Sequence, residues 1–217
     1  SNEAVPEPLP VSAPERLSVF FDYLCPYAWR GAELCELLEG KLELEVHWHH
    51  FSVEENRPGR GGQHQLWNAR VDPEDASGGR GLLPFLASCA ARRQGAAAYR
   101  GFRLAALRAH HQQGLPYTRA VLFGVAEAVG LHLPSFERDF DNPERRTMLA
   151  NEHHQALLLN VRRSPTFRFA SGQMAQLRLG SVPTSPDAAV GLFRACRDLL
   201  EHHPDLEGLE RVRCRCN

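Results

Sequence analysis

The sequence lacks a charge excess of either sign, and it lacks any long apolar run. It carries 25 lysine and arginine residues against 26 aspartate and glutamate residues, which gives a formal net charge of −1. A nearly neutral chain does not attract nucleic acid or an anionic membrane by bulk electrostatics, so we expect neither as a partner. No apolar stretch approaches the ~20 residues that a membrane-spanning helix needs.

Regularly spaced cysteines are also lacking. The six cysteines are scattered, unlike those of a secreted disulfide scaffold, and no signal-peptide apolar region opens the sequence. We therefore expect a cytoplasmic protein. Hydrophobic residues make up 43% of the chain, which is enough for a globular core. Residues 1–15 contain four prolines and are predicted to form a flexible leader.

The first half of the sequence predicts a strand, a helix and a second strand. Residues 16–23, "RLSVFFDY", are rich in β-branched and aromatic side chains, which is typical of a buried strand. Pro26 suits the first turn of a helix, and apolar residues recur at helical spacing over residues 26–39. Residues 41–51, "KLELEVHWHHF", alternate between apolar and polar side chains, as a strand does. The three elements form a βαβ unit.

Helical periodicity dominates residues 82–160, where glycine or proline separates successive segments. Two short strands are predicted beyond this block, in "SPTFRFA" and "QMAQLRLG", around a turn at Ser171-Gly172. Residues 185–203 then form an amphipathic helix, with Ser185 as its cap. The element order is therefore βαβ, a helical block and ββα, followed by a charged tail.

This order, with a cysteine at the start of the first helix and Pro-Thr at the start of a late strand, resembles the DsbA family of thioredoxin-fold oxidoreductases. The branch it resembles holds the FrnE-like and 2-hydroxychromene-2-carboxylate isomerase-like proteins. The segments that carry the resemblance are "FFDYLCPYAWRGAE", "VHWHHFSVEENRP", "RLAALRAHHQQGLPYTRAVLFGVAEAVGL" and "RRSPTFRF". The chain departs from the family in reading Cys25-Pro26-Tyr27-Ala28 where two cysteines are usual.

The resemblance implies an α/β protein with a thioredoxin-like fold and an all-helical insertion between the βαβ and ββα halves. Residues 16–60 and 161–203 would form the thioredoxin-like domain. Residues 61–160 would form the insertion, and residues 204–217 would be a charged tail.

The resemblance also implies an active site around a nucleophilic Cys25. The residues expected to support it are Pro26, Tyr27, Ala28 and Trp29. Pro165 would be cis and would face the cysteine, and the exposed backbone of Ser164 would pair with a thiol substrate. Thr166 would begin the strand under the site.

A cysteine at a helix start is expected to be reactive because only the thiolate attacks a disulfide. The helix dipole favours an anion by ~0.3–2 kcal/mol, which would lower the thiol pKa to about 7. A neighbouring charge could lower it further, and Arg30, Arg162, Arg163 or a histidine could supply that charge.

A second thiol normally resolves the mixed disulfide. Cys35 lies on the same helix, roughly 15 Å from Cys25, beyond the reach of a disulfide. Cys89 and Cys196 are predicted to be buried structural thiols. Cys214 and Cys216 lie in the charged tail and form a possible redox tail, although idle thiols at a frayed end are the alternative. Without them, a small thiol would act as resolver.

Three functions stay open at this point. The first is a monothiol oxidoreductase that uses glutathione or another low-molecular-weight thiol as co-reactant, with no tightly bound cofactor. The second is a transferase or isomerase similar to the kappa-class glutathione transferases, in which Cys25 replaces the usual serine. The third is a non-catalytic binding module. A homodimer is left open, and the histidines lack a metal-site spacing, so we expect no bound metal.

Overall fold

The computed structural model describes residues 13–57 and 65–211 of the chain. Its centre is a four-stranded sheet in the order β2-β1-β3-β4. The strands are β1 (Glu15–Phe21), β2 (Leu44–His50), β3 (Thr166–Arg168) and β4 (Met174–Gln176). β1 runs parallel to β2 and antiparallel to β3, and β3 runs antiparallel to β4. The sheet therefore joins two halves of the chain that are far apart in sequence.

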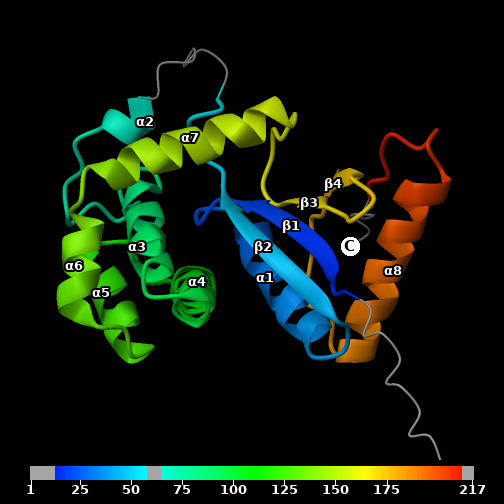
Figure 1. The fold of residues 1–217 in the computed structure, drawn as a ribbon, viewed down its shortest axis with the longest axis horizontal. Coiled ribbons are helices and arrows are strands. Elements are labelled where there is room, and N and C mark those ends of the chain that lie inside the picture. The colour runs from blue at the N-terminus through cyan, green and yellow to red at the C-terminus, as the bar shows by residue number, and fades with distance from the viewer. Residues whose placement is uncertain (1–12, 58–64, 212–217) are drawn as a thin grey trace, which may run out of the picture.

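Helices α1 (Pro26–Glu39) and α8 (Pro186–His202) pack against each other beside this sheet (Figure 1). α1 links the parallel strands β1 and β2, and α8 follows β4, so the βαβ and ββα halves are both present. The predicted cap of α8 is confirmed, because the Ser185 hydroxyl accepts the backbone N–H of Ala188 at 3.1 Å. The fold is a thioredoxin-like α/β fold.

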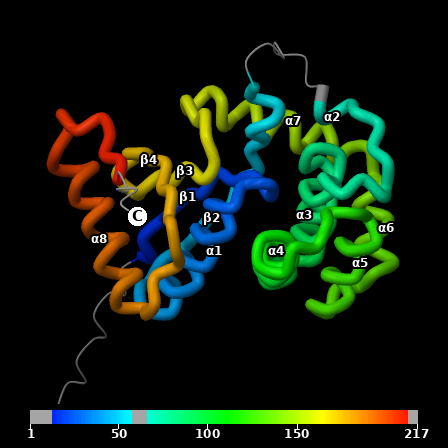
Figure 2. Tube along the Cα trace, turned by 180° about the vertical axis from the view of Figure 1, so that it is seen from behind, coloured from blue at the N-terminus to red at the C-terminus, as the bar shows by residue number. Residues whose placement is uncertain are grey.

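An all-helical insertion separates the two halves and lies to one side of the sheet (Figures 1 and 2). Its main helices are α3 (Leu82–Arg92), α4 (Ala96–His111), α5 (Arg119–Ala128), α6 (Leu133–Phe140) and α7 (Glu144–Leu158). α3 is its core: every residue of α3 except Arg92 is buried, and α4, α5, α6 and α7 all contact it. α7 leads the chain back across β2 to the sheet.

Ion pairs tie the insertion to α1. Arg108 of α4 forms two hydrogen bonds to the carboxylate of Glu33 on α1, at 2.6 and 2.8 Å. One turn further along α1, Arg100 binds Glu36 in the same paired way and also lies 3.0 Å from Glu39. Such paired geometry fixes orientation as well as distance. α4 is therefore held alongside α1.

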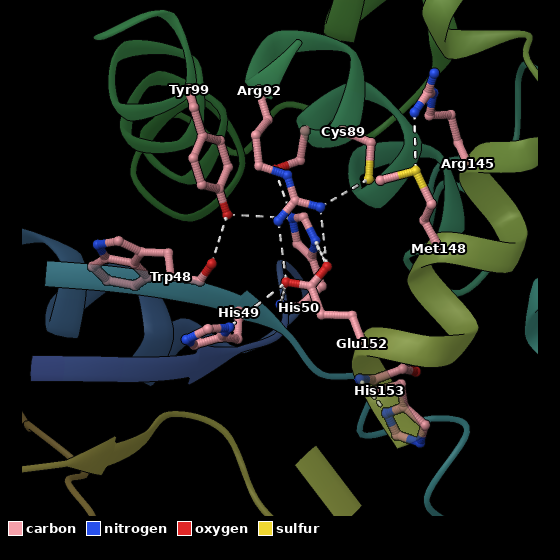
Figure 3. Close-up of polar contacts among 12 residues, drawn as sticks. Trp48, His49, His50, Cys89, Arg92, Tyr99, Arg145, Met148, Glu152 and His153 are labelled. Carbon is pink, nitrogen blue, oxygen red and sulfur yellow. Dashed lines mark hydrogen bonds and ion pairs between the residues drawn. The ribbon is translucent and has the colours of Figure 1, made fainter. Parts of the chain in front are cut away.

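A buried polar network joins the sheet to α3 and α7 (Figure 3). The Glu152 carboxylate on α7 accepts two hydrogen bonds from Arg92 and one from Nδ1 of His50, which lies at the end of β2. On its other side, Nε2 of His50 lies 2.8 Å from the Ser88 hydroxyl, which accepts the Tyr23 hydroxyl at 2.7 Å. The network therefore runs from the loop before α1 to α7.

The predicted strands are longer than the observed ones: β1 ends at Phe21 rather than at residue 23, and β3 covers only Thr166–Arg168. β2 begins at Leu44 rather than at residue 41, because the chain from Lys41 to Glu43 turns after α1. β4 ends at Gln176 rather than at residue 180. There the carbonyl of Leu179 accepts Nη1 of Arg30, at 3.1 Å, instead of a neighbouring strand. A short helix, α2 (Gln65–Asn68), precedes α3 in the insertion.

Glu152→Gln is expected to lower the free energy of unfolding by about 2 kcal/mol, because it leaves the partly buried Arg92 without its counter-charge and weakens the hydrogen bond to buried His50. Burial acts to raise the pKa of Glu152, but the combined effect of His50 and Arg92 is larger. The pKa of Glu152 is therefore held below its ordinary range. The stabilisation is therefore present at neutral pH and is lost as the pH falls. Urea unfolding measures the effect, with exposed Glu127→Gln as a control expected within about 0.5 kcal/mol. Equal losses in both variants would contradict the prediction.

Candidate active site

Cys25 occupies the position just before helix α1, with an extended backbone at φ −87° and ψ 116°. Pro26 follows as the first helical residue, where its missing N–H leaves no partner unpaired. The Cys25 carbonyl accepts the N–H of Ala28 at 3.0 Å, and the Cys25 N–H donates to the Asp22 carbonyl at 3.1 Å. These contacts hold the cysteine at the positive end of the helix.

The segment before β3 forms the second side of the site. The peptide bond between Ser164 and Pro165 is cis, as the resemblance implied. The thiol of Cys25 donates a hydrogen bond to the Ser164 carbonyl oxygen at 3.2 Å. The predicted nucleophile and the predicted substrate-binding segment, 139 residues apart in sequence, therefore meet in space. Thr166 starts β3 directly beside them.

Ser164 is buried, with 4% of its surface exposed, whereas the sequence analysis expected an exposed backbone. Its hydroxyl accepts the backbone N–H of Asp22 at 2.9 Å. Its carbonyl receives the Gln176 side-chain amide at 3.4 Å in addition to the Cys25 thiol. A substrate that pairs with this carbonyl must therefore displace one of these two donors.

Burial raises the pKa of the Cys25 thiol above its ordinary value. The N–H groups of Ala28 and Tyr27 and the contact with Ser164 lower the pKa, but they do not offset the loss of water around the sulfur. The predicted lowering to about 7 is therefore wrong. The helix start is present, but the half-buried sulfur is poorly solvated.

Two of the positive charges proposed for the thiolate form hydrogen bonds elsewhere. Arg30 donates to the Leu179 carbonyl, and Arg162 donates to the carbonyls of Leu157 and Val161. The charged side chain that does act on Cys25 is Asp22, which raises its pKa. An arginine in the same stretch of sequence is thus a poor guide to electrostatics at the sulfur.

Asp22 is a site residue that the sequence analysis missed. Its carboxylate accepts the backbone N–H groups of Leu24 at 2.9 Å and Val53 at 2.8 Å. Burial raises its pKa to about 6 in spite of these hydrogen bonds. An acidic residue directly after the apolar run of β1 was the available signal, because a buried carboxylate needs dedicated partners. Asp22 shapes the loop from which Cys25 projects.

His111 of α4 is a second missed residue, and it brings the insertion to the site. Its Nε2 lies 2.7 Å from the Tyr23 carbonyl, and its ring stacks near that of Trp29, with centroids 6.4 Å apart. Burial lowers the pKa of His111 to about 4, so the ring is neutral and donates from Nε2. Arg30 lies over the rings of Tyr27 and Trp29, at 5.6 and 5.7 Å. No spacing in the sequence points to His111.

The other cysteines differ in accessibility. Cys89 is buried, as predicted, and Cys35 is buried too; burial raises the pKa of both thiols. Cys196 is only half-buried, which corrects the prediction of a buried thiol. These three and Cys25 are free thiols. Cys214 and Cys216 lie outside the described residues.

The structure has cavities elsewhere. One of about 530 Å³ lies between α7 and the sheet, and one of about 230 Å³ lies within the insertion; neither includes Cys25.

Within residues 13–57 and 65–211, no three histidine, cysteine or acidic side chains are grouped as a metal site requires. Among the described helices, none is both long and apolar enough to cross a membrane.

Comparison with solved structures assigns the fold. The cytosolic disulfide reductase DsbM from Pseudomonas aeruginosa, in a structure with GSH, is 19% identical with a TM-score of 0.56, over 84% of this chain and 99% of that chain. A 2-hydroxychromene-2-carboxylate isomerase is 16% identical with a TM-score of 0.60, over 89% and 100%. The thiol–disulfide exchange protein α-DsbA2 from Wolbachia pipientis is 12% identical with a TM-score of 0.58, over 85% and 81%.

These likenesses confirm the predicted architecture of a thioredoxin-like sheet with a helical insertion. The chain has the fold shared by DsbA-type thiol–disulfide proteins and the hydroxychromene-carboxylate isomerases. No family model and no curated protein sequence matches it. The chemistry of this chain must therefore be argued from its own residues.

The alkylation rate of Cys25 by iodoacetamide is expected to keep rising with pH after a free cysteine has levelled off. The reason is that burial raises the pKa of the Cys25 thiol, and only the thiolate reacts. Peptide mass spectrometry across a pH series follows the site, and an unstructured peptide with one cysteine is the reference. If the alkylation rate of Cys25 reached its midpoint at a lower pH than that of the peptide, the raised pKa of Cys25 would be contradicted.

Proposed function

We propose that this protein is a thiol–disulfide oxidoreductase that uses Cys25 as the single nucleophile at the helix start. The observation that carries the proposal is the 3.2 Å contact between the Cys25 sulfur and the Ser164 carbonyl. It puts a thiol against the backbone segment where an extended substrate can pair. Ala28, which is fully buried, stands where a second cysteine of the helix would be, so the helix itself supplies no resolving thiol.

The raised pKa of Cys25 favours reduction of disulfides over their formation. A thiol–disulfide protein is a strong oxidant when its active-site thiolate is stabilised, because the reduced form is then favoured. At Cys25 burial outweighs the stabilisation of the thiolate by nearby N–H groups, so its disulfide-bonded form is relatively more stable. Once formed, the thiolate of a higher-pKa thiol is also the stronger nucleophile. Cys25 is therefore suited to attack a disulfide and reduce it.

The reaction has two exchange steps. The Cys25 thiolate attacks a sulfur of a mixed disulfide between a substrate and a small thiol. The S–S bond breaks, the substrate leaves as a thiol after taking up a proton, and the small thiol stays bound to Cys25 as a disulfide. A second small thiol attacks that disulfide and leaves as the small-molecule disulfide, and Cys25 is a free thiol again. Glutathione or a similar low-molecular-weight thiol fits this role.

Residues around Cys25 have separate tasks in the proposal. The N–H groups of Tyr27 and Ala28 face the sulfur and stabilise the thiolate that forms during exchange. Trp29 and neutral His111 provide an aromatic wall from α1 and α4. Asp22, with a pKa of about 6, holds the loop and orients Ser164 through its backbone N–H. Free thiols at all four described cysteines agree with work in a reducing cytoplasm.

A transferase or isomerase is the second candidate. The presence of a single nucleophile position favours it, as does a fold shared with a hydroxychromene-carboxylate isomerase. In that case a small thiol would bind next to Ser164, and Cys25 would only donate a hydrogen bond to its sulfur. The two candidates differ in whether Cys25 forms a covalent bond.

Cys25→Ser is expected to abolish reduction of glutathione mixed disulfides, with a loss of at least about 100-fold, because an alcohol does not perform thiol–disulfide exchange. The assay follows release of a chromophoric thiol from its mixed disulfide with glutathione. The Cys196→Ser variant is the matched control and should keep its rate within about twofold. A Cys25→Ser variant that retains the wild-type rate would remove the oxidoreductase proposal and leave the transferase.

A further inference from the structure

The cavity of about 530 Å³ between α7 and the sheet lies on the face of the sheet that α1 does not cover. Side chains alternate along β1, so Val19 points into the core that includes α1, whereas Phe20 packs against Ala156 of α7. Phe20 lines the cavity and Cys25 does not, so the cavity is separate from the candidate active site. Pockets of about 300–1,000 Å³ are typical of sites for small molecules.

The sheet supplies an aromatic surface to this cavity. The rings of Phe20 and His49 stack, with centroids 4.9 Å apart and an angle of 23° between the planes. Phe20 is buried, whereas 38% of the His49 side chain is exposed, so the imidazole is the member of the stack that a ligand can touch. Met148 and Leu159 add partly exposed apolar surface. An imidazole face and a thioether both favour an aromatic ring as their neighbour.

The charges that line the cavity do not balance. The Glu152 carboxylate lies between Arg92 and His49, 3.2 Å from Nη1 of Arg92 and 4.0 Å from Nδ1 of His49 (Figure 3). Burial lowers the pKa of His49, so its ring is neutral at pH 7. Arg92 and Glu152 therefore neutralise each other.

Arg168 of β3 is the second arginine of the lining. Its side chain is exposed, and within the described part of the chain its guanidinium has no hydrogen bond and no ion pair. The cavity thus has one positive charge without a counter-charge. A guanidinium presents a planar pair of N–H donors that matches an oxyanion, so this charge favours a ligand with a single negative group.

Two amide side chains of α7 supply further hydrogen-bonding groups. Asn151 and Gln155 are four residues apart, so they lie on the same face of the helix, and both line the cavity. Neither side-chain amide is hydrogen-bonded to another residue of the described chain. Each can therefore donate to or accept from a polar substituent of a ligand.

We propose that this cavity binds a small aromatic molecule that carries one negative charge. The ring of the ligand stacks on His49, its anionic group pairs with Arg168, and the amides of α7 bind its other polar groups. The site is distinct from Cys25, so the proposal does not depend on the oxidoreductase function.

The test compares two probes that differ only in charge. Isothermal titration calorimetry with the full, reduced chain measures the binding of 1-naphthoate and of the uncharged 1-naphthalenemethanol. The wild type should bind 1-naphthoate about fivefold more tightly, as a partly exposed ion pair allows. Arg168→Gln should remove this preference and leave the affinity for the alcohol within about twofold. Arg194→Gln, which removes an exposed arginine of α8, should change neither affinity.

A second pair of variants tests the location. Gln155→Trp fills the cavity and should weaken the binding of both probes at least about tenfold, because the ring of the ligand no longer has room. His154→Trp is the matched control: it changes the neighbouring exposed residue of α7, which does not line the cavity, and should bind as the wild type does. Far-UV circular dichroism checks that each variant is folded.

Three results would overturn the proposal. The first is no binding of 1-naphthoate to the wild type at millimolar concentration. The second is an unchanged preference for 1-naphthoate in Arg168→Gln, which needs no change in the core to interpret. The third is loss of 1-naphthoate binding in Cys25→Ser, which would place the ligand at the thiol instead. None of these results bears on the reduction of disulfides by Cys25.

Discussion

The contact between Cys25 and Ser164 is the constraint on which the site depends. The thiol donates to the Ser164 carbonyl, and the Ser164 hydroxyl in turn accepts the backbone N–H of Asp22, three residues before the cysteine. These two hydrogen bonds join the start of α1 to the chain before β3, across the boundary between the two halves of the fold. Burial of the sulfur at this position raises the pKa of Cys25, although the hydrogen bond to Ser164 itself lowers it. The burial that comes with this placement of Cys25 therefore makes its thiol less ready to ionise.

Most of the fold could be predicted from local patterns. A period of two in β2 and a helical period in α1, α4 and α7 follow from which face of each element is buried. Ser185 and Pro26 marked helix starts, because each satisfies or removes an unpaired backbone N–H. The end of β4 could not be predicted from local pattern, because the carbonyl of Leu179 beyond it is bound by Arg30, which is distant in sequence.

The candidate site was predictable only in part. Cys25 and Pro165 carried signals, because a proline at a helix start and one at a strand start each restrict the backbone. The pKa of Cys25 could not be derived from the helix start alone, since it depends on how far Ser164 and the surrounding loops exclude water. His111 reaches the site only through the packing of α4 against α1, so no motif of neighbouring residues includes it.

The ion pairs between α4 and α1 have a consequence for how the protein responds to salt. Arg108 and Arg100, each about half exposed, hold the helix that carries His111 against the helix that carries Trp29. Dissolved ions screen exposed charges within about 8–10 Å at physiological ionic strength, and more strongly in concentrated salt. The hold of α4 on α1 is therefore set by electrolyte as well as by packing. Concentrated salt would weaken the attachment of the insertion to the helix that follows Cys25, and dilute buffer would strengthen it.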